Sequence, residues 1–140
     1  AKFYLNSSGS ATKSDTNPLI LNGAMYYLQI KHRNSIETWN SGSVFTGGMQ
    51  TYDFTVSAGA AYGSNQIQVD SSPVKFAVFG GDVNQDRTVD ITDVSIIDND
   101  IFNFASGYIV TDLNGDEIID LSDISIADNN SFNFVSAVLP

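Results

Sequence analysis

Residues 82–104 and 112–134 are two copies of one unit, and this repeat limits the folds open to the chain more than any other feature. "DVNQDRTVDITDVSIIDNDIFNF" and "DLNGDEIIDLSDISIADNNSFNF" lie 30 residues apart and agree at 12 of 23 positions. A duplicated unit this short packs against its copy, because it cannot bury a core alone. The identical pairs are Asp82/Asp112, Asn84/Asn114, Asp86/Asp116, Asp90/Asp120, Asp93/Asp123, Ser95/Ser125, Ile96/Ile126, Asp98/Asp128, Asn99/Asn129, Phe102/Phe132, Asn103/Asn133 and Phe104/Phe134.

Each copy begins with oxygen-bearing residues at the spacing of an EF-hand-type calcium loop. Such a loop supplies ligands from positions 1, 3, 5, 7, 9 and 12, with the backbone carbonyl used at position 7. A single match of this kind is common in acidic loops, whereas two complete matches in register are specific. The predicted metal ligands are Asp82, Asn84, Asp86, Thr88, Asp90 and Asp93 in the first copy, and Asp112, Asn114, Asp116, Ile118, Asp120 and Asp123 in the second.

The charge of these loops favours a bound cation. Two carboxylates about 5 Å apart repel by about 3 kcal/mol at an effective dielectric constant near 20, and each loop brings four aspartates together. A solvated acidic surface would not require the ligand spacing. We therefore predict two Ca²⁺ ions, one in each loop, and expect metal binding to be linked to folding of this half.

Two positions differ from the usual EF-hand loop. Position 12 is Asp where Glu is usual, so the following helix must approach the metal more closely. Position 6, usually Gly, is Arg87 in the first loop and Glu117 in the second. A non-glycine residue in a left-handed conformation costs roughly 1 kcal/mol, so calcium binding is expected to be weakened but not abolished. Their opposite charges would also allow a contact between the two loops.

An apolar stripe follows each loop and predicts an exiting helix of two to three turns. Its residues are Ile91, Val94, Ile97 and Ile101 in the first copy and Leu121, Ile124 and Ala127 in the second. No helix is expected before either loop, because "VKFAVFGG" is strand-like and "FASGYIVT" is a connector.

Residues 81–139, with this duplicated loop and single exiting helix, resemble the type I dockerin family. The resemblance implies an extracellular calcium-binding module that docks onto a cohesin domain. Dockerins often recognise cohesin through a Ser-Thr-like pair after ligand position 9. The pairs here, Ile91–Thr92 and Leu121–Ser122, are only half polar.

The first half of the chain is predicted to be β-structure. "AMYYLQIKHRN" alternates Tyr26, Leu28, Ile30 and His32 with polar residues, and "TYDFTVS" at residues 51–57 alternates in the same way. Further strands are expected in "KFYLN", "PLILNG", "SVFT", "NQIQV" and "VKFAVF". The predicted class is α+β: an antiparallel, Ig-like β-sandwich in residues 1–79, followed by a small helical module with two calcium loops in residues 80–140.

Charge and composition restrict the partners. Residues 1–79 carry five Lys or Arg and four acids, whereas residues 80–140 carry one Arg and twelve acids. Nucleic acid and anionic membrane are therefore poor partners for the second half. No apolar run approaches about 18 residues, so membrane insertion is not expected. The chain has no cysteine and therefore no disulfide.

No catalytic constellation is apparent, and an enzyme is the least favoured class. His32 is interpreted as a hydrogen-bonded structural histidine. Glu37 and Trp39 could belong to a sugar site, but a single Trp in a sandwich is more often part of the core. A carbohydrate-binding sandwich stays open as an alternative.

Two function classes fit the sequence. In the first, the chain is an extracellular or cell-surface adaptor whose calcium-ordered half binds a cohesin-like receptor. In the second, copies of the chain form a homo-polymer, a filament or surface matrix stabilised by calcium and by strand addition. The apolar ends "AKFYL" and "FVSAVL" suggest the second class, because each could extend the sheet of a neighbour.

Overall fold

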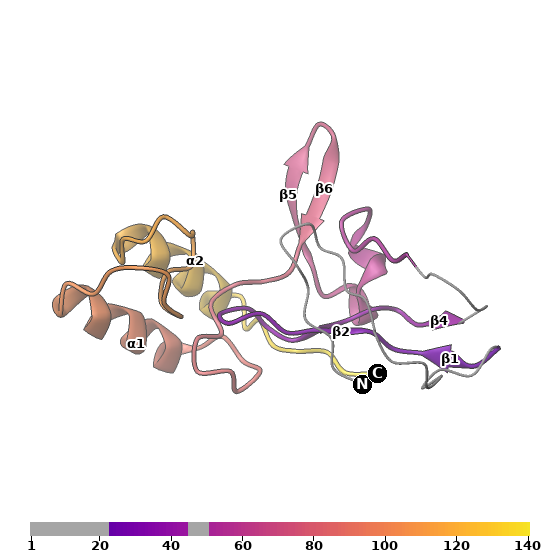
Figure 1. Cartoon of the computed structure of the whole chain (residues 1–140), viewed down its shortest axis with the longest axis horizontal. Helices are drawn as coiled ribbons and strands as arrows, with labels where there is room; N and C mark the ends of the chain where they lie inside the picture. The colour runs from indigo at the N-terminus through magenta and orange to yellow at the C-terminus, as the bar shows by residue number, and fades with distance from the viewer. Residues whose placement is uncertain (1–22, 45–50) are drawn as a thin grey trace, which may run out of the picture.

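The computed structural model describes residues 23–44 and 51–140, and it contains both strands and helices, which confirms the α+β class. The helices lie at one end of the molecule and the strand pairs at the other (Figure 1). The elements are β1 (Met25–Tyr26), β2 (Gln29–Ile30), β3 (Thr38–Trp39), β4 (Ser43–Val44), the 3₁₀ turns η1 (Ala58–Ala60) and η2 (Tyr62–Ser64), β5 (Ile67–Ser71), β6 (Val74–Ala77), α1 (Ile91–Phe102) and α2 (Leu121–Phe132).

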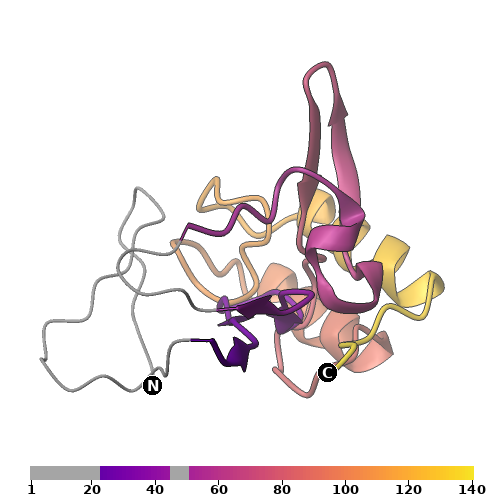
Figure 2. The ribbon, with the colours of Figure 1, turned by 90° about the vertical axis from the view of Figure 1, so that its right-hand side faces the viewer.

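The described strands form three antiparallel pairs. β1 pairs with β4, β2 with β3, and β5 with β6. The β5–β6 hairpin, predicted as "NQIQV" and "VKFAVF", projects away from the rest of the chain (Figure 2). The predicted strands "KFYLN" and "PLILNG", apart from Gly23, and the end of "SVFT" lie outside the described residues. The Ig-like sandwich therefore stays a prediction.

The strand predicted at residues 51–57 is wrong, because this segment forms turns. The Asp53 carboxylate accepts hydrogen bonds from the backbone N–H and the hydroxyl of Thr55, both at 2.8 Å. Such a local bond gives the backbone an alternative to strand pairing. The Tyr52 hydroxyl also donates to the carbonyl of Ala60. This bond holds the start of the segment against η1, so the alternating sequence forms a turn and not a strand.

The long strand predicted from "AMYYLQIKHRN" is divided into β1 and β2, and its inward face is only partly correct. Tyr26 and Ile30 are half-buried, but Leu28 and His32 are exposed. The side chain of Asn40 accepts a hydrogen bond from the Leu28 N–H at 2.8 Å, which occupies the gap between the two strands. Burial is concentrated further along the chain, in the continuous segment 34–38.

Both predicted exiting helices are confirmed. Asp90 and Asp120 are the N-caps, and each forms a reciprocal capping box with the aspartate three residues later, Asp93 or Asp123. A capping box satisfies backbone N–H groups that the first helical turn leaves free. The two segments that lead directly into the loops, residues 74–81 and 104–111, contain no α-helix, as expected.

Both helices end in the same unusual way. The N–H groups of Phe104 and Ala105 donate to the carbonyls of Ile101 and Asp100, which is a Schellman motif. The left-handed position, usually Gly, is Phe104 with φ 53°, and its repeat equivalent Phe134 has the same φ. An aromatic residue with positive φ is an outlier. The "NF" of each repeat therefore marks a helix end that displays a phenylalanine ring to solvent.

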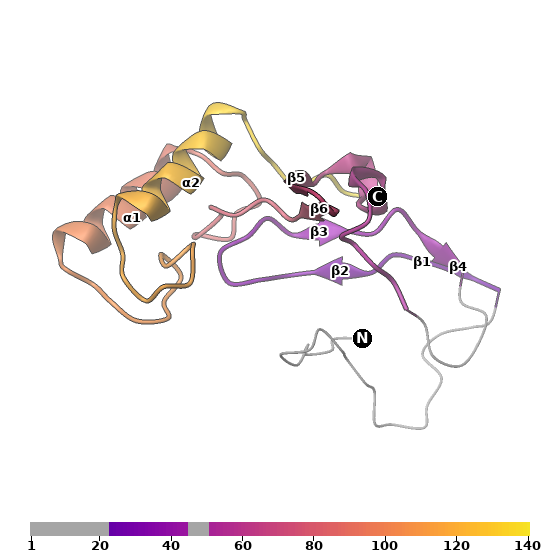
Figure 3. The same ribbon diagram turned by 90° about the horizontal axis from the view of Figure 1, so that it is seen from above.

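Two apolar clusters hold the described chain together. The first joins α1 and α2, which pack side by side (Figure 3), around Val83, Ile97, Ile119 and Ala127. The second, Ile36, Val89 and Val135, contains residues from both halves of the sequence. Both loops contribute an apolar residue at position 8, Val89 and Ile119, so folding of the loops and of the cores is coupled.

The C-terminal segment predicted as a free strand is already paired. The carbonyl of Val135 accepts from the Val89 N–H at 2.9 Å, and Ser136 forms a bridge with Thr88. The other end, "AKFYL", lies outside the described residues. Among the described helices, neither is long and apolar enough to cross a membrane.

Candidate metal centre

The first predicted loop is organised by hydrogen bonds between its ligand side chains and its own backbone. Asp82, at position 1, is buried and accepts from the N–H groups of Asp86 and Arg87 at 3.1 and 3.2 Å. Asn84 accepts from the Asp86 N–H at 2.8 Å, and Asp86 accepts from the Thr88 N–H at 3.0 Å. Each side chain thus fixes the backbone of the next ligand position.

The second loop repeats this scaffold. Asn114 accepts from the Asp116 N–H at 2.8 Å, and Asp116 accepts from the Ile118 N–H at 2.9 Å. The amide groups of Asn84 and Asn114 donate to the position 5 carboxylates at 2.9 Å in both loops. The two loops therefore share these hydrogen bonds at positions 3 and 5, whereas at position 1 Asp82 accepts from Asp86 and Arg87 and Asp112 accepts from Gly115.

The aspartates at position 12, Asp93 and Asp123, are completely buried at the centre of their loops. One oxygen of Asp93 accepts from the N–H groups of Val83 and Asn84, at 2.8 and 3.1 Å, and the other accepts from the N–H of Asp90 at 3.0 Å. Asp123 makes the equivalent bonds. The short side chain thus draws the helix N-terminus onto the loop, as expected for Asp at this position.

Position 6 adopts the left-handed conformation that its usual glycine would favour. Arg87 has φ 82° and Glu117 has φ 67°. Their carbonyls accept hydrogen bonds at 2.8 Å from the N–H groups of Ala137 and Gly107, respectively. Among the described residues Arg87 and Glu117 form no ion pair with each other, although their opposite charges would allow one. Arg87 pairs with Glu37 of the first half instead.

The two copies pair reciprocally. Thr88, at position 7 of the first loop, bridges to Ser136 after α2, while Ile118, at position 7 of the second, bridges to Ser106 after α1. Each loop is thus closed by the segment that follows the helix of the other copy. Two separate bridges, one for each loop, thus join the two copies.

The chemistry of the loops fits calcium, because every donor is a carboxylate, amide or carbonyl oxygen. The second loop gives the more specific evidence. Asp112 is fully buried, one of its oxygens accepts from the Gly115 N–H at 2.7 Å, and the other, Oδ2, accepts no hydrogen bond and has only an ion pair at 3.6 Å with Arg33. A buried carboxylate oxygen that accepts no hydrogen bond is costly, and coordination to a cation would lower that cost.

The carboxylates of each loop do not converge in this arrangement. Among the described residues, no three acidic or histidine side chains are close enough to hold a metal ion. The side chains at positions 3 and 5 are exposed, whereas those at positions 1 and 12 are buried. Binding thus requires the exposed side chains to turn inward onto the buried pair.

Burial and hydrogen bonding shift the pKa values in opposite directions. Burial raises the pKa of Asp82, since removal from water disfavours its charged form. The hydrogen bonds from Thr92 lower the pKa of Asp90, and those from Ser122 lower the pKa of Asp120. Position 9 is thus held ionised, while position 1 of the first loop resists ionisation.

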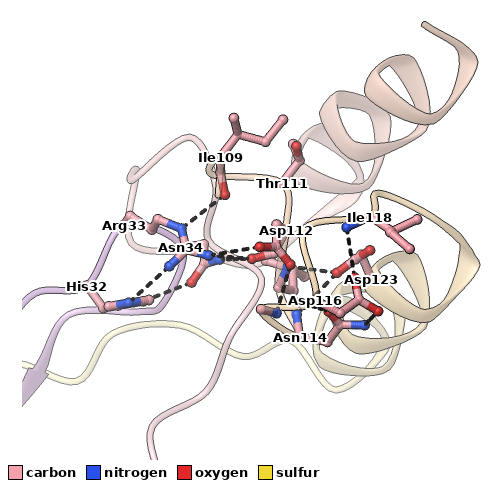
Figure 4. A network of polar contacts seen from close by, with 12 residues as sticks. His32, Arg33, Asn34, Ile109, Thr111, Asp112, Asn114, Asp116, Ile118 and Asp123 are labelled. Carbon is pink, nitrogen blue, oxygen red and sulfur yellow. Dashed lines mark hydrogen bonds and ion pairs between the residues drawn. The ribbon is translucent and has the colours of Figure 1, made fainter. Parts of the chain in front are cut away.

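The first half of the chain clamps the second loop through Arg33 and Asn34, as Figure 4 shows. Arg33 donates to the carbonyls of Ile109 and Asp112, at 3.0 and 2.8 Å, and Asn34 also donates to the Asp112 carbonyl at 2.8 Å. The Arg33 guanidinium lies 3.6 Å from Asp112 Oδ2 and stacks over the ring of Tyr108. The positively charged side chain of Arg33, from the first half of the chain, therefore lies beside the predicted calcium ligand Asp112.

The same segment clamps the first loop. Glu37 is buried and forms an ion pair with Arg87, whose Nε lies 3.1 Å away, while Gln85 donates to the Ser35 carbonyl at 3.2 Å. Lys31 and Gln29 bind the other carboxylate oxygen of Glu37. Residues 33–37 thus lie between the two loops and contact both.

These clamp residues were missed by sequence reasoning. Arg33 was placed on the outward face of a strand, and Glu37 was considered only as part of a sugar site. The one available signal is the pair of opposite charges, Arg33 and Glu37, on either side of the apolar Ile36. If Ile36 is buried, charged residues this close to it need partners from other parts of the chain. His32, interpreted as structural, is hydrogen-bonded to Asn34 at 2.9 Å.

No protein-family model matches the chain, and neither curated proteins nor solved structures give a significant match. The assignment of this site therefore rests on its own residues and geometry.

Proposed function

We propose that residues 80–140 bind two Ca²⁺ ions and serve as a dockerin-like, non-catalytic interaction module of an extracellular protein. The observation that carries this proposal is the shared hydrogen bonding of the two loops at ligand positions 3, 5 and 12, together with Oδ2 of buried Asp112, which accepts no hydrogen bond. Calcium would order both loops, because each is closed by the segment that follows the other.

The clamp in residues 33–37 extends this proposal to the whole chain. Because Arg33 and Asn34 hold the carbonyl of Asp112, calcium binding would also fix the first half, for which an Ig-like sandwich is proposed. The partner is proposed to be a cohesin-like receptor that binds the calcium-ordered surface.

A second candidate, a self-assembling filament or surface matrix, is favoured by the β5–β6 hairpin. All five residues of β5 are exposed, and both strands are edges within the described sheet. An exposed edge strand is a template for pairing with another chain. The partner would then be a further copy of this chain.

Particle mass distinguishes the two candidates. Light scattering in calcium and in EDTA should give a monomer with ordered far-UV circular dichroism in calcium under the adaptor proposal. Heterogeneous high-mass particles in calcium would favour the filament. If neither the dichroism nor the melting temperature responds to EDTA, the calcium proposal is wrong.

A further inference from the structure

A pocket of about 550 Å³ lies where η2 and the start of β5 face the C-terminal end of α2. The chain that leaves α2 returns past β5 at this place (Figure 3). None of the residues that line the pocket is charged, although the chain has a net charge of −10. Its volume falls within the range of small-ligand sites.

The pocket is rich in side-chain amides whose N–H groups are already used. Asn65 donates to the Ser136 carbonyl at 3.0 Å, Asn130 to the Gly80 carbonyl at 2.8 Å, and Asn133 to the Asn129 carbonyl at 2.7 Å. No hydrogen bond among the described residues reaches the oxygens of these three amides. An amide oxygen accepts two hydrogen bonds. These amide oxygens are therefore free of protein hydrogen bonds and can accept from a ligand that donates.

Gln66 is a fourth amide of the lining and gives the strongest evidence for an unused acceptor. The residue is 7% exposed, it lines the pocket, and its Oε1 is buried without a hydrogen-bond partner. A buried acceptor left unpaired costs about 1–3 kcal/mol. Because the oxygen itself is covered, a ligand reaches it by rotation of the terminal amide, a torsion with a broad, low-energy range.

Phe134 provides an aromatic wall. It lines the pocket, is 88% exposed and holds the left-handed position at the end of α2. Its repeat equivalent, Phe104, has the same φ and is 92% exposed but does not line the pocket. The repeat thus supplies a natural control.

We propose that this pocket binds a neutral saccharide. Sugar hydroxyls donate to amide oxygens, and the C–H face of a pyranose ring packs on the electron-rich face of an aromatic side chain. An ammonium ligand would need a carboxylate partner, and an anion a cationic one, and the pocket offers neither. The site does not use the calcium ligands, so it stands apart from the calcium proposal.

The test is a titration of the full chain, in saturating calcium, with maltohexaose, cellohexaose and xylohexaose, followed by ¹⁵N-resolved NMR. At least one of them should shift the side-chain amide signals of Gln66 and Asn133. Phe134→Ala should weaken that binding by about tenfold or more, the equivalent of about 1.4 kcal/mol, while Phe104→Ala leaves it unchanged. Gln66→Leu should also weaken binding without lowering the melting temperature, because it removes an unpaired buried acceptor.

The proposal is overturned if none of the three sugars shifts these signals at millimolar concentration. It is also overturned if the shifts map to residues outside the pocket, or if Phe104→Ala and Phe134→Ala weaken binding equally. Unchanged far-UV circular dichroism and backbone NMR dispersion in both variants show that a loss of binding is not a loss of folding.

Discussion

The Arg87 guanidinium lies 3.1 Å from the carboxylate of Glu37, which is buried in the other half of the chain. Arg87 occupies the loop position where glycine is usual, in a left-handed conformation. A glycine there would relieve the backbone but could not reach Glu37. Arg87 therefore strains the backbone of the loop but links the two halves of the chain through an ion pair.

Glycine substitutions at the two equivalent positions should have opposite effects. Glu117→Gly should raise the free energy of unfolding by about 0.5 kcal/mol, because it relieves a left-handed residue without removing an ion pair among the described residues. Arg87→Gly should lower it by about 1 kcal/mol, since loss of the ion pair with buried Glu37 outweighs the relief. Urea denaturation of both variants in calcium measures the difference. Equal effects would show that the Glu37 pair contributes nothing.

Gly81 should not tolerate a side chain. It has φ 111°, and a Cβ there would lie 2.9 Å from Val89 Cγ1 and 3.1 Å from Ala127 Cα. Gly81→Ala is expected to lower the free energy of unfolding by about 2–4 kcal/mol through overpacking and backbone strain. Gly107→Ala is the matched control, because Gly107 has φ 95° but open space around its Cα, so about 1 kcal/mol is expected. Thermal melts of the two variants that coincide would contradict this packing.

The helices, the loops and the left-handed position 6 could be predicted from the sequence, because they depend on local spacing. The apolar stripe predicts the length of α1. The spacing of the ligand residues predicts the loop before it, whose residue at position 9 is the N-cap of the helix. The clamp could not be predicted, since Arg33 and Asp112 are 79 residues apart and no periodicity links them. The turn at Asp53 was missed because its alternating pattern matches that of a strand, while one side-chain hydrogen bond decides the outcome.

Removal of the Arg33 clamp should loosen the second loop more than the first. Arg33→Gln keeps a donor but removes the charge beside Asp112 Oδ2, which lies 3.6 Å away. The calcium affinity of the second loop should rise severalfold, because a competing cation is gone, while the metal-free protein becomes less stable by about 1–2 kcal/mol. Lys75→Gln, on the exposed β6 strand, is the control. An unchanged affinity in Arg33→Gln would show that the guanidinium does not compete for Asp112.

Acidification should weaken calcium binding at the first loop. Burial holds the pKa of Asp82 above its ordinary value, so the metal-free folded protein takes up a proton there at a higher pH than the unfolded chain does. Stability contributed by the protonated form is therefore lost as the pH rises through that pKa. Calcium binds the ionised form, so proton and metal compete. In Asp116→Ala, which leaves only the first loop intact, the affinity should begin to fall on acidification at a higher pH than the ordinary pKa of an aspartate would give. An affinity that falls only at that ordinary pKa would show that burial of Asp82 does not control binding.

Calorimetric titration of the metal-free chain with Ca²⁺ tests the central claim most directly. The account predicts two ions per chain, falling to one in Asp86→Ala and to one in Asp116→Ala, because each variant removes an exposed ligand of one loop. Asp98→Ala, an exposed acid on α1 outside the ligand set, should still bind two. A chain that takes up no calcium, or loses none of it in the two loop variants, would contradict the assignment of these loops as metal sites.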